Sequence, residues 1–289
     1  MIKKPERTQP PYTQAIAAIE AIPGLESLSE WLVTVLTPVT RRRTLMDVLN
    51  GRWLGHALHP ALSDVPIGMW ASVPVLDLMG DGTGATMLTA AGCIAAGATA
   101  ATGAADWSVT IGRDRRLALV HGLANTAVLG IQLGSLAARL RGRTGRGRML
   151  SLAGLAAGAV AAYLGGELVL GRALMVDHDA WISGPSEWTD VVADTDVSEG
   201  ALSVVDVDSR KVLLTRVDGR VCALENTCTH AGGPLNEGTV EDGDVVCPWH
   251  GSRFRLSDGA VVGGPATFPL PRLETRKVAG RIQIRGREG

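Results

Sequence analysis

Two short segments near the C-terminal end each combine one cysteine with one histidine. The first, at residues 228–235, reads CTHAGGPL, and the second, at residues 247–254, reads CPWHGSRF. Thiolates and imidazoles are the side chains with which proteins hold zinc ions and iron–sulfur clusters. We therefore predict a metal site whose four ligands are Cys228, His230, Cys247 and His250.

The chain around these segments is expected to bring them together. Sixteen residues separate His230 from Cys247, and the Asp242-Gly243 pair among them is a strong hairpin signal. A hairpin of that length would carry both segments at one tip. Glycines at 232, 233 and 251 allow backbone N–H groups to turn toward the ligands.

The C-terminal third has the pattern of a small all-β domain. Apolar, β-branched runs occupy 202–207, 211–216 and 220–225, and Asp218-Gly219 joins the last two. Similar turn pairs follow at 258–259 and 279–280, the second before an alternating strand at 281–285. We expect this domain to cover residues 188–287.

A structural zinc ion is the alternative, because two cysteines and two histidines also form an acceptable zinc shell. Zinc fingers of this composition usually carry their histidines together on a helix. Here each histidine follows its own cysteine within a β pattern, which favours an iron–sulfur cluster. Cys222 lies in an expected core strand and Cys93 in an apolar run, so neither is assigned a ligand role.

The combination of C-x-H with C-P-W-H-G-S resembles the Rieske signature. This resemblance implies an ISP-like β domain with a [2Fe-2S] cluster, in which two cysteines bind one iron and two histidines bind the other. Carried over, Cys228 and Cys247 hold the buried iron, and His230 and His250 hold the outer one. With two thiolates in place of four, the oxidised cluster is neutral and accepts an electron more readily.

Two departures indicate the ferredoxin type of Rieske domain. Rieske proteins of cytochrome bc complexes carry an additional, disulfide-forming cysteine in each loop, whereas this chain has Gly233 and Trp249 near those positions. Phe254 replaces a frequent tyrosine, although Ser252 is kept. Fewer hydrogen bonds to sulfur should lower the potential. The resemblance points to ferredoxins of oxygenase systems and nitrite reductases.

Residues 55–172 read as an all-α transmembrane four-helix bundle. Runs at 84–105, 117–138 and 149–170 are almost free of charged side chains, and each is long enough to cross the ~30 Å hydrocarbon core. A less apolar segment at 61–80, with Asp64 and Asp77, is counted with them. A buried soluble bundle is the alternative. The chain is thus expected to be a multidomain, multi-pass integral membrane protein of the lipid bilayer.

Motifs in this half resemble a predicted membrane-protein family of unknown function that is sometimes fused to Rieske domains. They are GHALHP at 55–60, PIG at 66–68, Asp77, Asp106-Trp107, Arg116 and His121. Ionisable groups within membranes are often functional. His121 with His56 or His59 could ligate a b-type haem or line a quinone site; the alternative is interfacial placement or helix-to-helix hydrogen bonding.

The remaining segments are expected to connect these parts. Residues 1–54 read as a polar lead without a secretory signal and with a short amphipathic helix near 25–39, and residues 173–187 read as a linker. If both termini lie inside, the inner ends of the spans carry eight arginines, at 41, 42, 43, 52, 113, 115, 116 and 172. This majority predicts a cytoplasmic Rieske domain, although the five arginines at 139, 141, 143, 146 and 148 favour the opposite orientation. A net charge of −1 gives no reason to expect nucleic acid as a partner.

Together these features predict a membrane-anchored, single-electron carrier within an oxidoreductase system. Its redox partner, a reductase, an oxygenase or a quinone, is not identified by the sequence. A complete oxygenase would need a mononuclear iron site, usually with two histidines, and no histidine follows His250. A redox sensor, in which the cluster state alters the membrane helices without turnover, is the alternative to a carrier.

Overall fold

The computed structural model describes residues 11–182 and 184–286, and the chain divides into two compact units. The helical unit comprises the residues up to Val39 together with Ala61–Arg172. The β unit comprises Thr40–Pro60 together with the residues from Ala173 onward. Residues 40–60 therefore group with the β unit, although the sequence patterns gave no indication of this.

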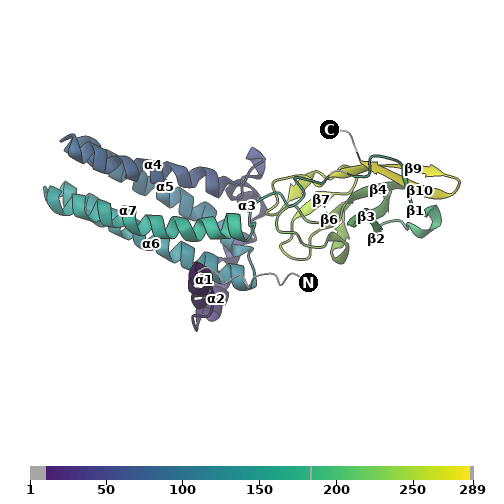
Figure 1. Cartoon of the computed structure of the whole chain (residues 1–289), viewed down its shortest axis with the longest axis horizontal. Coiled ribbons are helices and arrows are strands. Elements are labelled where there is room, and N and C mark those ends of the chain that lie inside the picture. The colour runs from purple at the N-terminus through teal and green to yellow at the C-terminus, as the bar shows by residue number, and fades with distance from the viewer. Residues whose placement is uncertain (1–10, 183, 287–289) are drawn as a thin grey trace, which may run out of the picture. The chain divides into compact units, whose positions relative to one another are not determined.

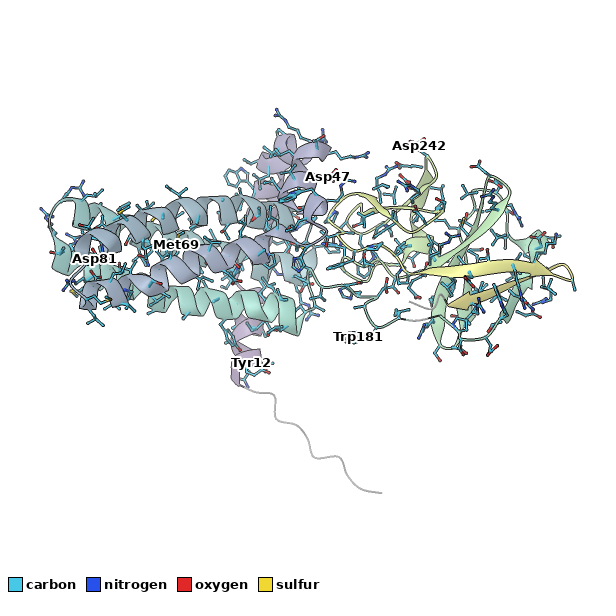
Figure 2. The ribbon with its side chains drawn as sticks, turned by 90° about the horizontal axis from the view of Figure 1, so that it is seen from above. Tyr12, Asp47, Met69, Asp81, Trp181 and Asp242 are labelled. Carbon is cyan, nitrogen blue, oxygen red and sulfur yellow. The ribbon has the colours of Figure 1, made fainter. Side chains whose placement is uncertain are left out.

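The helical unit is built on four long helices joined by short turns (Figure 1). One such turn contains Asp81, whose carboxylate accepts the Gly84 N–H at the start of a helix (Figure 2). The helices are α1 (Pro11–Glu20), α2 (Leu25–Thr40), α4 (Leu58–Leu78), α5 (Gly82–Ser108), α6 (Gly112–Leu140) and α7 (Thr144–Gly166), which continues as η2 (Glu167–Gly171). Helix α2 matches the amphipathic helix predicted near 25–39.

Three of the four expected spans are confirmed as helices long and apolar enough to cross a membrane: α5, α6 and α7 with η2. The count of four spans was one too many. The segment predicted at 61–80 does form a helix, α4, but Asp64, Asp77 and two prolines within it lower its apolar character. The unit is therefore three apolar helices beside one less apolar helix.

Small residues on α7 allow it to lie close to α6. A Cβ atom at Gly147 would lie only 2.6 Å from Cγ of Arg139, and one at Gly154 only 2.7 Å from the amide nitrogen of Gln132. Glycine at these positions therefore leaves room for large polar side chains between the two helices. Close approach through small residues is typical of helix pairs in membranes.

A buried ion pair joins three of the long helices. Arg139 of α6 donates from Nη1 and Nη2 to the two carboxylate oxygens of Asp77 on α4, at 2.8 and 2.6 Å. Arg148 of α7 reaches the same carboxylate at 3.3 Å. Because each charge has a close partner, the cost of burying it away from water is largely offset.

The β unit contains two antiparallel sheets. The larger has the order β1-β10-β9-β4-β3-β2 and the smaller β5-β6-β7-β8. The strands are β1 (Thr189–Ala193), β2 (Ser203–Val207), β3 (Arg210–Val217), β4 (Arg220–Glu225), β5 (Thr239–Glu241), β6 (Asp244–Val246), β7 (Arg253–Arg255), β8 (Val261–Gly263), β9 (Arg272–Val278) and β10 (Arg281–Gly286). The strands expected at 202–207, 211–216, 220–225 and 281–285 are confirmed as β2, β3, β4 and β10.

The predicted turn residues form hairpins. Asp218 and Gly219 between β3 and β4 have φ values of 50° and 74°, and Asp242 and Gly243 between β5 and β6 have 53° and 80°. These positive values suit the tight turns that match strand twist. Asp242 lies at the tip of its hairpin (Figure 2).

Residues 40–60 contact the loops of the β unit. They contain α3 (Arg43–Leu49) and η1 (Arg52–Leu54). The Arg52 guanidinium donates to the carbonyl of Val262 at 2.7 Å, and the ring of His56 lies edge-on to Phe268 with centroids 6.2 Å apart. These contacts between residues far apart in the chain explain why the segment groups with the β unit.

Candidate metal centre

The first predicted ligand loop follows β4 and is closed by its own backbone. The Cys228 N–H donates to the carbonyl of Gly233, and the Gly232 N–H donates back to the carbonyl of Cys228, both at 2.8 Å. Gly232 has a φ of 75°, a conformation that favours glycine. Preceding the loop, the side-chain amide of Asn226 bonds to Asn236, which ties the two ends together.

The second ligand loop, between β6 and β7, repeats this pattern. The Cys247 N–H donates to the carbonyl of Ser252 at 2.8 Å, and the Gly251 N–H donates to the carbonyl of Cys247 at 3.1 Å. Gly251 has a φ of 71°. The glycine four residues after each cysteine therefore closes its loop by donating to the cysteine carbonyl, whereas the sequence pattern predicted that its N–H would turn toward the sulfur.

The two thiols lie together at the bottom of the site, and both are buried. A hydrogen bond with the Cys247 sulfur, together with burial, raises the pKa of the Cys228 thiol, and the same bond lowers the pKa of Cys247 to about 7. The backbone N–H of His230 and the hydroxyl of Ser252 also donate to the Cys228 sulfur. The pair thus shares a proton that a bound metal would displace.

The two imidazoles also lie together. The rings of His230 and His250 are 5.0 Å apart and nearly perpendicular. His230 is only 5% exposed, and within the described part of the chain neither of its ring nitrogens has a hydrogen-bond partner. Burial, and then the nearby His250 and His178, lower the pKa of His230 to about 3. It is therefore neutral, which is the form that binds metal.

The four donors form two pairs, thiol with thiol and imidazole with imidazole, and do not all point at one metal position. Among the residues that the structure describes, no three His, Cys, Asp or Glu side chains are grouped as ligands of a single metal ion. The donor chemistry and the unpaired, buried imidazole nitrogens of His230 fit a binuclear iron–sulfur group, in which each iron needs only two protein ligands.

The segment expected to be a plain linker contacts the first ligand loop. The His178 N–H donates to the carbonyl of Thr229 at 3.3 Å, and the Thr229 hydroxyl donates to the carbonyl of Phe268 at 2.8 Å. Asp179, next in the chain, is 3% exposed. These residues could not be predicted from the sequence, because nothing in their local pattern distinguishes them from a linker.

The membrane-domain histidines have structural contacts. His121 of α6 is within hydrogen-bond distance, 2.9 Å, of the carbonyl of Ala161 on α7. This is the helix-to-helix hydrogen bond weighed against the haem and quinone interpretations for His121. His56 contacts Phe268 within the β unit. These contacts give His121 and His56 a structural explanation.

Comparison with known proteins identifies the C-terminal domain. Residues 187–274 match the Rieske [2Fe-2S] domain family. The ferredoxin CarAc of Metapseudomonas resinovorans is 36% identical over 101 residues, which are 34% of this chain and 94% of that ferredoxin. The chain belongs to the Rieske [2Fe-2S] family. Residues 55–180 of this Rieske protein match a second family, the predicted membrane proteins DUF2231, so the expected fusion is confirmed.

Other similar proteins are also ferredoxins. The ferredoxin component of the naphthalene 1,2-dioxygenase system of Pseudomonas aeruginosa is 32% identical over 98 residues, 34% of the Rieske protein and 94% of the component. The solved ferredoxin of carbazole 1,9a-dioxygenase from Nocardioides aromaticivorans IC177 is 25% identical with a TM-score of 0.34, covering 35% of this chain and all of that one. The Rieske family match and the curated ferredoxin relatives show that the protein is an electron-transfer component whose cofactor is a [2Fe-2S] cluster.

Proposed function

We propose that this chain is a membrane-anchored Rieske protein whose [2Fe-2S] cluster is held by Cys228 and Cys247 at one iron and by His230 and His250 at the other. The observation that carries this assignment is the pairing of thiol with thiol and of imidazole with imidazole. A structural zinc ion would need four donors around one point, and the described residues offer no convergent group of three.

His250 is the ligand through which the electron enters and leaves. The residue is half-buried, although both its ring nitrogens are covered, whereas His230 is buried, and the adjacent Trp249 is 47% exposed. The bound cluster supplies a one-electron donor and acceptor. Trp249 and His250, with ring centroids 6.2 Å apart, would then meet the redox partner at the surface.

The helical unit anchors the protein in a lipid bilayer. The three apolar helices expose large apolar side chains along their length, including Met87, Ile94 and Val160. Water would make such a surface costly, because extensive apolar exposure is rare on soluble proteins. A hydrocarbon environment accepts these side chains without penalty and explains why the helices are so poor in charge.

The partners are a reductase that supplies electrons and an acceptor, either an oxygenase or a membrane quinone. The relatives support this class of partner, because their names describe ferredoxin components of dioxygenase systems. A ferredoxin component carries electrons between other proteins and needs no substrate site of its own.

Redox-titrated electron paramagnetic resonance of membranes containing the full chain tests the cluster and its ligands. Cys228→Ala should abolish the Rieske signal, and His230→Cys should lower the potential or prevent assembly, since a third thiolate adds negative charge. Cys222→Ala, which removes a buried thiol outside the loops, should leave the signal intact. A protein containing zinc, but neither iron nor acid-labile sulfide, would overturn the proposal.

Steady-state turnover separates the carrier from a redox sensor. With a reductase and a soluble acceptor present, a carrier sustains a continuous electron flux that depends on the cluster. A sensor would instead take up electrons once, in proportion to its cluster content. Flux that ceases after one equivalent would contradict the carrier function while leaving the cluster assignment intact.

A further inference from the structure

Helix α2 presents two apolar sides, of which only one is covered by the helical unit. On the covered side, Leu25, Leu32 and Leu36 pack in one cluster with Trp107 of α5 and Leu119 of α6. An ion pair between Glu26 and Arg116 of α6 fixes the rotation of α2 about its own axis. The helix is therefore held in a defined orientation on the bundle.

These contacts show where α2 lies along the length of helices α5 and α6. Trp107 is the residue before the last of α5, and Leu119 lies in the second turn of α6. Helix α5 has 27 residues and is about 40 Å long, which exceeds the ~30 Å hydrocarbon core, so its ends reach the headgroup region. Helix α2 thus packs beside the ends of α5 and α6 (Figure 1), and in a bilayer-spanning bundle these ends would reach the membrane–water boundary.

The second apolar side of α2 lies next to the covered side and is left exposed by the bundle. Leu28, Trp31, Val35 and Val39 recur at steps of three and four residues and form one stripe, and all four are exposed, Trp31 by 60% and Val35 by 52%. The stripe is continuous around the helix with the covered side. Glu26, Glu30 and Thr34 occupy the remaining, polar side.

The length and charge of α2 decide how it can meet a membrane. With 16 residues it is about 24 Å long, too short to span, and its two glutamates oppose insertion across the bilayer. A helix with a broad apolar arc and a polar side instead lies in the plane of the interface. Tryptophan is enriched at this depth. Three arginines at 41–43 follow directly, and they can meet lipid phosphates.

We propose that α2 is an interfacial helix whose stripe of Leu28, Trp31, Val35 and Val39 inserts into the headgroup region of the lipid bilayer. This inference rests on the proposed membrane anchoring. Helix α5 ends and α6 begins beside α2, and the chain leaves the helical unit at this same end, after α7 and η2. The helix therefore marks the end of the bundle at which the chain continues toward the β unit.

Tryptophan quenching by brominated lipid tests the proposal. The full-length, cluster-loaded protein is placed in phosphatidylcholine nanodiscs with bromine on the acyl chains near the headgroup, and compared with its Trp31→Phe variant. The emission that Trp31 contributes, obtained as the difference between the two proteins, should be largely lost in brominated discs. Trp188→Phe is the matched control, because Trp188 lies on the β unit between Arg276 and Arg285.

Each outcome has a distinct meaning. If the Trp31 contribution is unchanged by bromine while the protein resists alkaline extraction from membranes, the interfacial helix is wrong and the anchoring stands. Cross-linking of Val35→Cys between two copies, without quenching, would show that a second chain covers the stripe and would also overturn the inference. Release of the protein by alkaline extraction would instead overturn the membrane anchoring itself.

Discussion

Ser252 links the metal centre to the surrounding backbone through a single hydroxyl. It is fully buried, donates to the Cys228 sulfur and accepts the N–H of Ala266 at 3.2 Å. A donor to a cluster sulfur stabilises the reduced, more negative state and raises the potential. Ser252, which the sequence shares with the resembled family, therefore lies where it can adjust the reduction potential of the cluster.

Ser252→Ala should lower the midpoint potential of the cluster. The same change leaves the Ala266 N–H without its partner and should cost about 1–3 kcal/mol of stability. Redox-titrated paramagnetic resonance measures the first effect and thermal unfolding the second. Ser203→Ala removes a hydroxyl that donates to Leu214, remote from the site, and should leave the potential unchanged. An unaltered potential in Ser252→Ala, with the cluster present, would contradict the assigned hydrogen bond.

Asp179 should make the stability of the β unit depend on pH. Burial, then the neighbouring Glu225 and Asp177, raise its pKa to about 8, and its carboxylate oxygens have no hydrogen-bond partner in the described structure. The folded protein therefore holds a proton that the unfolded chain releases near pH 4. The stabilising contribution of protonated Asp179 is fully present below about pH 4. It is lost as the pH rises from about 4 toward 8, by at most about 1.4 kcal/mol per pH unit.

Asp179→Asn should remove most of this pH dependence, since the amide cannot ionise. The measurement is the unfolding temperature of the full-length protein between about pH 5 and pH 8. Asp206→Asn, at an exposed position on β2, serves as the control and should keep the wild-type slope. Parallel slopes for Asp179→Asn and the wild type would show that Asp179 is ionised in the folded state.

At the scale of elements, the α6–α7 pair depends on where glycine stands. Gly147→Ala would place its Cβ 2.6 Å from Arg139 Cγ and 3.4 Å from the carbonyl of Ser135, disturbing the Arg139–Asp77 ion pair. We expect a loss of about 1–3 kcal/mol from overpacking. Gly145→Ala, two residues earlier on α7, meets nothing within 4 Å and should be neutral or slightly stabilising. Thermal unfolding in detergent compares the two, and equal unfolding temperatures would contradict this packing.

The buried ion pair bears on the orientation of the whole protein in the membrane. Of the arginines near the α6–α7 turn, Arg139 and Arg148 bind Asp77. Arg148 is 49% exposed but its charge is paired with Asp77, which leaves Arg141, Arg143 and Arg146 as the remaining exposed arginines of that turn. Arg113 is exposed at the α5–α6 turn, and the exposed Arg41, Arg42 and Arg43 directly follow α2, which packs beside that turn. The positive-inside rule then favours a cytoplasmic Rieske domain.

We therefore expect trypsin to cut the Rieske domain in inside-out membrane vesicles and to leave it intact in right-side-out vesicles. The exposed arginines of the α6–α7 turn should show the opposite pattern. Cleavage of the Rieske domain from the outside would reverse the orientation without affecting the cluster assignment.

Local sequence patterns were sufficient for much of this protein. The hairpin pairs Asp218-Gly219 and Asp242-Gly243 predicted turns that the structure confirms, because backbone conformation at a tight turn is set by the residues in it. Apolar runs likewise predicted α5, α6 and α7, because the apolar residues that indicate each helix lie within that helix. The C-x-H and C-P-W-H-G-S motifs were sufficient to indicate the Rieske family, because the ligand types and their spacing are local features.

Tertiary structure alone decided which distant residues meet. Arg52 reaches Val262 across 210 positions, and Asp77 reaches Arg139 across 62, so no local pattern could reveal either contact. The contact of His178 with Thr229 likewise made a functional neighbour of an apparent linker. Periodicity and spacing report how a segment folds on itself, but the partner of a buried charge or histidine depends on how whole elements pack, and that is settled only in three dimensions.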